Sequence, residues 1–204
     1  MTNIKRKNSK IRHMGLFLIL AGIIPVFIQK YETFNYHTIE NQALSSFFDS
    51  FDEIEIIDKK RQESSISSYI AVLEIPSIRL RRGLTNPESK YNYVDYNVQI
   101  INGSNMPDEN KNLILAAHSG YGRTAFFKNL DKLRMNDYAF IYYYGKKYKY
   151  VLNYNYSETK NGTITISRDI TKSTLTLTTC NKYDDSLQDI YIFYLVSIED
   201  KEEF

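Results

Sequence analysis

Short apolar runs separated by turn-forming residues follow one another through the chain from about residue 69 onward. The clearest is Ser173 to Cys180, in which Thr174, Thr176 and Thr178 alternate with their neighbours, the period-two pattern of a strand with two different faces. Further strands are predicted at 69–76, 78–84, 98–101, 112–118, 138–144, 147–156, 162–166 and 190–196. Many short strands with little helix predict an all-β fold, either an antiparallel barrel or a sandwich.

Two connections carry stronger local signals than the rest. Gly145-Lys146 lies between two strands rich in Tyr and predicts a hairpin. The tyrosine-rich strands around it are interpreted as barrel wall, with alternate rings inside and outside. The segment 124–133 predicts the one short helix of this region, because Thr124 suits the N-cap and an apolar side repeats along it.

The N-terminus has a different pattern. Five Lys or Arg residues and no acid occupy residues 1–13, and residues 14–28 follow without a charge. This stretch is shorter than the usual span of about 17–25 residues, but no clear cleavage motif follows it, so an uncleaved signal anchor over 1–30 is predicted. The leading cations predict a cytoplasmic N-terminus and an exported C-terminal part, with a single crossing of the cell membrane. A cleaved signal peptide is the alternative, and it exports the same domain.

Residues 31–67 are predicted to form an extracellular stalk, and residues 68–204 the functional domain. Residues 39–51 have the pattern of an amphipathic helix, and the charged run at 58–65 is typical of a solvated linker.

Composition narrows the classes of function. A net charge of +2 over 204 residues, with no basic tract beyond the N-terminus, argues against a nucleic-acid partner. One Cys excludes an internal disulfide and a multi-cysteine zinc site, and three His make a His-rich centre improbable. No acidic ligand spacing indicates a calcium loop, so neither a metal nor a cofactor is predicted.

Candidate chemistry lies at the ends of two strands. Cys180 ends one strand and His118 ends another, each before a polar loop. If both strand ends lie on the same rim, the imidazole can activate the thiol or protonate a leaving amine. Taken singly, a lone Cys is more often a small buried hydrophobe and a lone His an ordinary polar residue. An unpaired cysteine in an exported domain, however, is a candidate reactive thiol.

These residues carry a family resemblance. The T-L-T-T-C sequence that ends at Cys180 resembles the T-L-x-T-C signature of sortases, the cysteine transpeptidases of Gram-positive cell surfaces. Residues 113–120, L-I-L-A-A-H-S-G, resemble the histidine-bearing strand of that family. Residues 69–76 resemble its first strand, and 102–104 its loop before the histidine strand. The match covers residues 68–200 in the family's order, and it implies a closed eight-stranded sortase-type β-barrel with one or two short helices after an N-terminal transmembrane helix.

The resemblance also implies a mechanism. The Cys180 thiolate would attack the carbonyl between Thr and Gly of an LPxTG-like sorting signal and form a thioester. His118 would protonate the departing amine and later deprotonate an incoming one, from a peptidoglycan precursor or a pilin lysine. Partners of these two kinds and a membrane contact through residues 14–30 are therefore expected.

One feature departs from the family pattern. Sortases carry an arginine on the strand after the cysteine, whereas no arginine follows Cys180 in this chain. Gln188 is the expected occupant of that position, where its amide NH2 can donate to a developing oxyanion without the charge. The alternative is that Gln188 faces solvent at the start of a strand. Arg123 and Arg168 are other possible sources of a positive charge.

Three functions therefore remain open from the sequence. The first is the transpeptidase, and the second is a catalytically silent sortase-like module that binds sorting signals. The third is an anchored cysteine hydrolase that uses no amine acceptor. The sorting motif, the acceptor and the sortase subclass are not determined by the sequence.

Overall fold

The structure is a computed structural model that describes residues 3–53, 69–109 and 111–200. The chain divides into two compact units, residues 1–41 and 42–204. The predicted linker at 58–65 lies outside the described residues.

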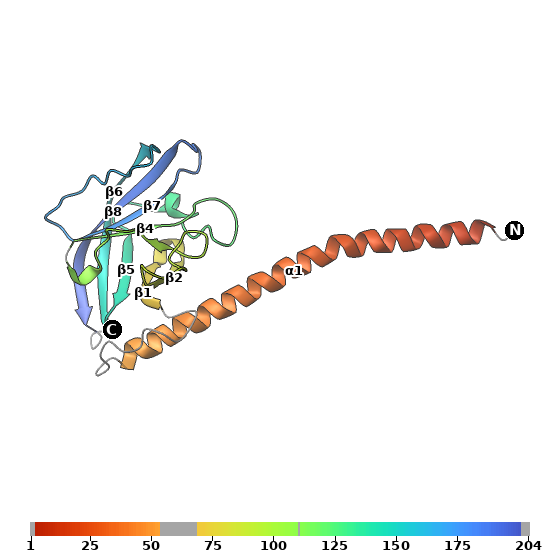
Figure 1. Cartoon of the computed structure of the whole chain (residues 1–204), viewed down its shortest axis with the longest axis horizontal. Helices are drawn as coiled ribbons and strands as arrows, with labels where there is room; N and C mark the ends of the chain where they lie inside the picture. The colour runs from red at the N-terminus through yellow and green to blue at the C-terminus, as the bar shows by residue number, and fades with distance from the viewer. Residues whose placement is uncertain (1–2, 54–68, 110, 201–204) are drawn as a thin grey trace. The chain divides into compact units, whose positions relative to one another are not determined.

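A long helix, α1 (Asn3–Glu53), contains the apolar N-terminal stretch and the predicted amphipathic segment (Figure 1). Its large apolar side chains between residues 14 and 28 are exposed, including Phe17 and Phe27 at 70% and 68%. Within the described residues, one helix, over His13–Ser50, is long and apolar enough to cross a membrane. Pro25 lies inside this helix.

The C-terminal part is an eight-stranded sheet that curls into a nearly closed barrel (Figure 1). Its spatial order is β2-β1-β5-β6-β8-β7-β4-β3, and the two end strands, β2 and β3, contact each other. Neighbouring strands of this sheet pair in antiparallel fashion except β4 with β7, which are parallel. The strands are β1 (Tyr69–Ile75), β2 (Leu80–Thr85), β3 (Gln99–Ile100), β4 (Asn112–Ala116), β5 (Tyr138–Tyr143), β6 (Lys146–Thr159), β7 (Thr174–Cys180) and β8 (Leu187–Asp200). The predicted barrel is thus confirmed. In the described part of the chain its strands are joined by three short 3-10 helices, η1 (Pro76–Ile78), η2 (Pro107–Glu109) and η3 (Leu130–Lys132).

The cysteine strand β7 is buried on both faces, not on one. All its residues except Cys180 are buried, and two of its buried threonines make hydrogen bonds to the neighbouring chain segment. Thr176 Oγ1 donates to Asn112 Oδ1 at 2.9 Å, and Thr179 Oγ1 donates to the carbonyl of Ala117 at 2.7 Å. Because buried hydroxyls are costly unless bonded, these contacts tie β7 specifically to β4.

The helix predicted over 124–133 is wrong: the chain forms successive turns there, and only Leu130–Lys132 is helical, as η3. Phe127 and Leu130 are still buried, as their apolar character requires. The backbone N–H of Phe127 donates to the carbonyl of His118, just after β4, and the N–H groups of Lys128 and Leu130 make only short turn bonds to the third residue before them, so no α-helical ladder forms.

The strand predicted over 162–166 is also absent. β5 pairs with β6 only over residues 146–151, so the edge of β6 beyond this range has no strand partner among the described residues, but the segment 162–166 does not form a backbone ladder with it. Tyrosine hydroxyls hold it instead. Tyr156 Oη donates to the carbonyl of Thr165 and accepts from the N–H of Ser167, and Tyr154 Oη donates to the carbonyl of Ser167.

The predicted hairpin is confirmed one residue earlier than its sequence signal. The turn between β5 and β6 is Tyr144-Gly145, with φ of 44° and 69°. Positive φ at both central residues is the geometry of a type I′ turn, whose twist matches that of the flanking strands. This geometry favours glycine, which explains why Gly145 is found there.

Candidate active site

The parallel register of β4 and β7 brings the candidate histidine and cysteine to the same end of the sheet. Ala116 is the partner of Thr178, and the N–H of Ala117 donates to the carbonyl of Thr178 at 3.4 Å. Continuing this register by two residues places His118 beside Cys180. Since side chains two residues apart point to the same face of a strand, both project to the side on which Ala116 and Thr178 lie.

Backbone and hydroxyl contacts hold this junction in place. Ser119 is buried, and its hydroxyl donates to the carbonyl of Cys180 at 2.6 Å. The carbonyl of His118 accepts the N–H of Phe127 at 3.0 Å. The two candidate residues therefore extend from fixed backbone, although each is followed by a loop.

A cavity of about 540 Å³ opens over this junction. His118 and Cys180 both line it, and the Cys180 side chain is exposed. The remaining lining comes from the two loops that follow these residues: Ser119, Gly120, Tyr121, Thr124, Lys128, Asn129, Asn181, Lys182 and Asp185. Such a concave surface, with a thiol and an imidazole in its wall, is a suitable place for an acyl substrate.

The loop after the cysteine is folded around Asn181. The Oδ1 atom of Asn181 accepts the N–H groups of Tyr183 and Asp184, and its Nδ2 donates to Asp189 at 2.7 Å. Lys182 extends from this loop to Asp131, with 2.8 Å between Nζ and Oδ2. The cavity wall on this side is thus preformed, which reduces the entropy lost when a substrate binds.

Gln188 is the direct cross-strand partner of Cys180 on β8. Directly opposed residues of an antiparallel pair project to the same face, so the two side chains lie on the same side of the sheet. Gln188 does not line the cavity, and its Nε2 atom is buried with no hydrogen-bond partner among the described residues. Gln188 as a whole is half-buried, so its role at the site stays a prediction.

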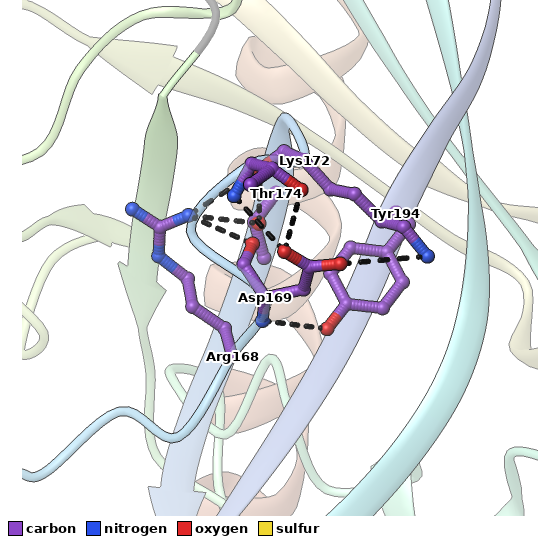
Figure 2. Close-up of polar contacts among 6 residues, drawn as sticks. Arg168, Asp169, Lys172, Thr174 and Tyr194 are labelled. Atoms are coloured by element: carbon purple, nitrogen blue, oxygen red, sulfur yellow. Dashed lines mark hydrogen bonds and ion pairs between the residues drawn. The ribbon is translucent and has the colours of Figure 1, made fainter.

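The other two arginines suggested by the sequence lie elsewhere. Arg168 Nη1 donates to the carbonyls of Asp169 and Lys172 at 3.3 Å and contacts Thr174 Oγ1 at 3.4 Å, at the start of β7 (Figure 2). Cys180 is at the other end of that strand, about 20 Å away at ~3.3 Å per residue. Arg123 is exposed in the loop after His118 and does not line the cavity.

Sequence reasoning missed one charged neighbour of the site. His118 Nε2 lies 3.0 Å from Asp95 Oδ1, across 23 residues of sequence. Asp95 is in the connection between β2 and β3, and no periodicity or motif there indicates a partner for His118. Ser119 was also missed as a contact of Cys180, although it directly follows the histidine.

No group of three or more His, Cys, Asp or Glu in the described part of the chain has an arrangement able to hold a metal ion.

The fold and site define a class: an eight-stranded barrel with a cysteine and a histidine on adjacent parallel strands above one cavity. A model of the sortase domain matches residues 73–196, which is more than half of the chain, and the chain therefore belongs to the sortase family. No curated protein sequence matches it.

Solved structures with the same fold are sortases. A Clostridium perfringens sortase D5 transpeptidase has a TM-score of 0.61 at 22% identity, over 78% of this chain and 99% of the other. Sortase C-3 from Streptococcus pneumoniae has a TM-score of 0.60 at 15% identity, over 79% of this chain and 83% of the other. Sortase A from Corynebacterium diphtheriae has a TM-score of 0.58 at 21% identity, over 72% of this chain and 68% of the other. At these identities the likeness supports the fold and leaves the subclass open.

Proposed function

We propose that this sortase is a membrane-anchored cysteine transpeptidase that cleaves an LPxTG-like sorting signal and transfers the acyl group to an amine. The observation that carries the proposal is the parallel register of β4 and β7, which brings His118 and Cys180 to one cavity. The amine would come from a peptidoglycan precursor or a pilin lysine.

The steps follow from the two side chains. Cys180, as the thiolate, attacks the scissile carbonyl, and the C–N bond breaks as a thioester forms. The proton that Cys180 gave up is held on His118 and passes to the departing amine. In the second half of the reaction, His118 takes a proton from the incoming amine. The amine attacks the thioester carbonyl, and the C–S bond breaks to release the Cys180 thiolate.

Gln188 is proposed to supply a hydrogen bond to the oxyanion that develops on the carbonyl. Its support is its place directly across from Cys180 and its buried amide nitrogen, which has no partner among the described residues. Because Gln188 does not line the cavity, a rotation of its side chain has to accompany substrate binding. Replacing a charged donor by an amide weakens such stabilisation by about 1–3 kcal/mol, or about one to two decades in rate.

The chain is proposed to consist of a cytoplasmic tail and anchor over 1–30, a stalk over 31–67 and an extracellular catalytic domain over 68–204. Its support is the apolar helix within His13–Ser50 together with the basic residues that precede the apolar stretch.

A second candidate is a sortase-like module that binds sorting signals without turning them over. It is favoured by one observation, the absence of any arginine after Cys180. The retained thiol and imidazole on the same cavity favour the enzyme.

The test uses the full-length chain in detergent with a panel of fluorogenic LPxTG-like peptides, with and without an amine acceptor. The transpeptidase predicts cleavage that is lost in Cys180→Ala and a ligated product when amine is added. Cleavage with no ligated product at any amine concentration would instead establish the hydrolase. Peptide binding without turnover, in both the natural chain and Gln188→Arg, would establish the binding module.

A further inference from the structure

The contact between His118 and Asp95 has a defined donor. An ionised carboxylate only accepts hydrogen bonds, so His118 Nε2 has to carry the proton at its 3.0 Å distance from Asp95 Oδ1. In the neutral ring this leaves Nδ1 as the nitrogen with a free lone pair. The contact thus selects one tautomer of the imidazole.

The segment that carries Asp95 is fixed by two buried asparagines. Asn92 accepts the N–H of Ile100 at 2.7 Å and donates to the carbonyls of Ile100 and Pro87. Asn97 donates to the carbonyl of Gly83 on β2 at 2.8 Å. The backbone is therefore held both before Asp95, by Asn92, and after it, by Asn97, which fixes the position from which the Asp95 side chain extends.

Backbone bonds complete this arrangement. The N–H groups of Tyr96 and Asn97 both donate to the carbonyl of Tyr93, which forms a compact turn with Asp95 inside it. His118 extends from equally fixed backbone at the end of β4. Because both partners are anchored, the carboxylate fixes the direction of the ring as well as its tautomer.

We propose that Asp95 is a positioning residue for His118, holding the ring through Nε2 so that Nδ1 exchanges protons with Cys180 and with the amines. The inference rests on the proposed function and deepens it. Nδ1 receives the thiol proton and gives it to the departing amine, while Asp95 remains a carboxylate throughout. The side chains of His118 and Asp95 are 43% and 64% exposed, so their ion pair contributes little to folding stability. Loss of Asp95 should therefore change the rate of the reaction more than the stability of the fold.

The direct test is the tautomer of His118 in the 15N-labelled full-length chain, read from long-range 1H–15N correlations of the ring. The chain has three His, so comparison with His118→Gln assigns the signal. We expect the Nε2–H tautomer in the natural chain, a mixture of tautomers in Asp95→Ala, and recovery of the Nε2–H form in Asp95→Glu. Glu88→Ala is the matched control, since it removes another exposed carboxylate of the same connection and keeps the bond that the Glu88 backbone N–H donates to Asn86 Oδ1.

Kinetics supply the second readout. For Asp95→Ala we expect kcat for a sorting peptide to fall by about tenfold or more with KM changed by less than about twofold, as for loss of a group that orients a general acid. Asp95→Glu should recover part of kcat, and Glu88→Ala should leave it unchanged.

An unchanged tautomer in Asp95→Ala, or an unchanged kcat, would overturn the inference. A lower melting temperature with an unchanged tautomer would overturn it too, because the role would then be structural. If the natural chain cleaves no peptide, the proposed function has failed, and the NMR comparison still decides whether Asp95 positions the ring.

Discussion

Gln188 lies directly across the β7–β8 ladder from Cys180, and its side-chain nitrogen is buried without a hydrogen-bond partner in the described part of the chain. Unpaired buried donors are rare because each costs about 1–3 kcal/mol. An unpaired donor beside a candidate nucleophile is what a site needs if that donor bonds to substrate only during the reaction.

Replacing Gln188 separates its role in stability from its role in the reaction. Gln188→Leu removes the unpaired donor, so we expect the free energy of unfolding to stay the same or to rise by up to about 1 kcal/mol, while peptide cleavage falls about tenfold or more. Gln188→Arg should raise cleavage by about 10–100-fold if a positive charge limits the rate. Urea unfolding beside each assay checks that the variants are folded. Equal cleavage by Gln188→Leu and the natural chain would remove Gln188 from the mechanism.

Thiol reactivity tests the pairing of the two strand ends without any peptide substrate. Iodoacetamide should modify the chain once, at Cys180, which is its only cysteine and is exposed. We expect His118→Ala to slow this reaction by about tenfold or more near neutral pH, because it removes the base beside the thiol. The rate is read by mass spectrometry, with His37→Ala in α1 as the control. A rate that is equal in both variants would show that the imidazole does not act on the thiol.

The hydroxyl bonds between β4 and β7 should support both stability and activity. Thr179→Val keeps the shape of a buried side chain but removes the bond to the carbonyl of Ala117, and Ser119→Ala removes the bond to Cys180. Each should lower the free energy of unfolding by about 0.5–1.5 kcal/mol and reduce cleavage, since the register that sets the site is loosened. Thr163→Val, at an exposed position, is the control for the same chemical change. Full activity in both buried variants would mean that β4 and β7 hold their register without these bonds.

The segment between β6 and β7 should depend on tyrosine hydroxyls for its order. Tyr156 makes two bonds to it, to the carbonyl of Thr165 and from the N–H of Ser167. Tyr156→Phe removes both bonds. We therefore expect faster hydrogen exchange across residues 161–172, measured by mass spectrometry, and a free energy of unfolding that is lower by about 1–2 kcal/mol. Tyr93→Phe, at an exposed tyrosine, is the control. Unchanged exchange in Tyr156→Phe would show that other contacts order the segment.

High pH should destabilise the barrel through its buried tyrosines. Burial raises the pKa of Tyr150 and Tyr191, and burial followed by the hydrogen bond with Tyr194 raises the pKa of Tyr154 to about 12. Above the ordinary tyrosine pKa of 10.0 the unfolded chain loses protons that the folded chain retains, so the unfolded state gains stability. The stabilisation is therefore complete below pH 10 and declines as the pH rises toward 12.

Urea unfolding at pH 9, 10 and 11 measures this decline, with absorbance at 295 nm reporting tyrosine ionisation. Tyr150→Phe should show a shallower decline than the natural chain because one buried ionisable group is gone. A stability that does not change between pH 9 and 11 would contradict the prediction.

The sequence allowed all strands of the barrel to be predicted, with one false strand over 162–166, and it indicated His118 and Cys180 as candidate site residues. Period-two patterns are local, so β1, β5, β6 and β7 could be located from them, and the hairpin followed from a glycine turn. The T-L-T-T-C sequence and the histidine strand indicated the family, which the sortase-domain match then showed.

The tertiary structure decided everything that depends on partners distant in sequence. The segments 124–133 and 162–166 have apolar patterns of helix and strand, yet the first forms turns in which Phe127 bonds to the carbonyl of His118, and the second is held by the hydroxyl of Tyr156 in β6. The contact of Asp95 with His118 depends on how two connections fold over the same barrel end. Local preference fixes which residues can form a strand, whereas the choice of neighbours is made by burial and hydrogen bonding across the whole sheet.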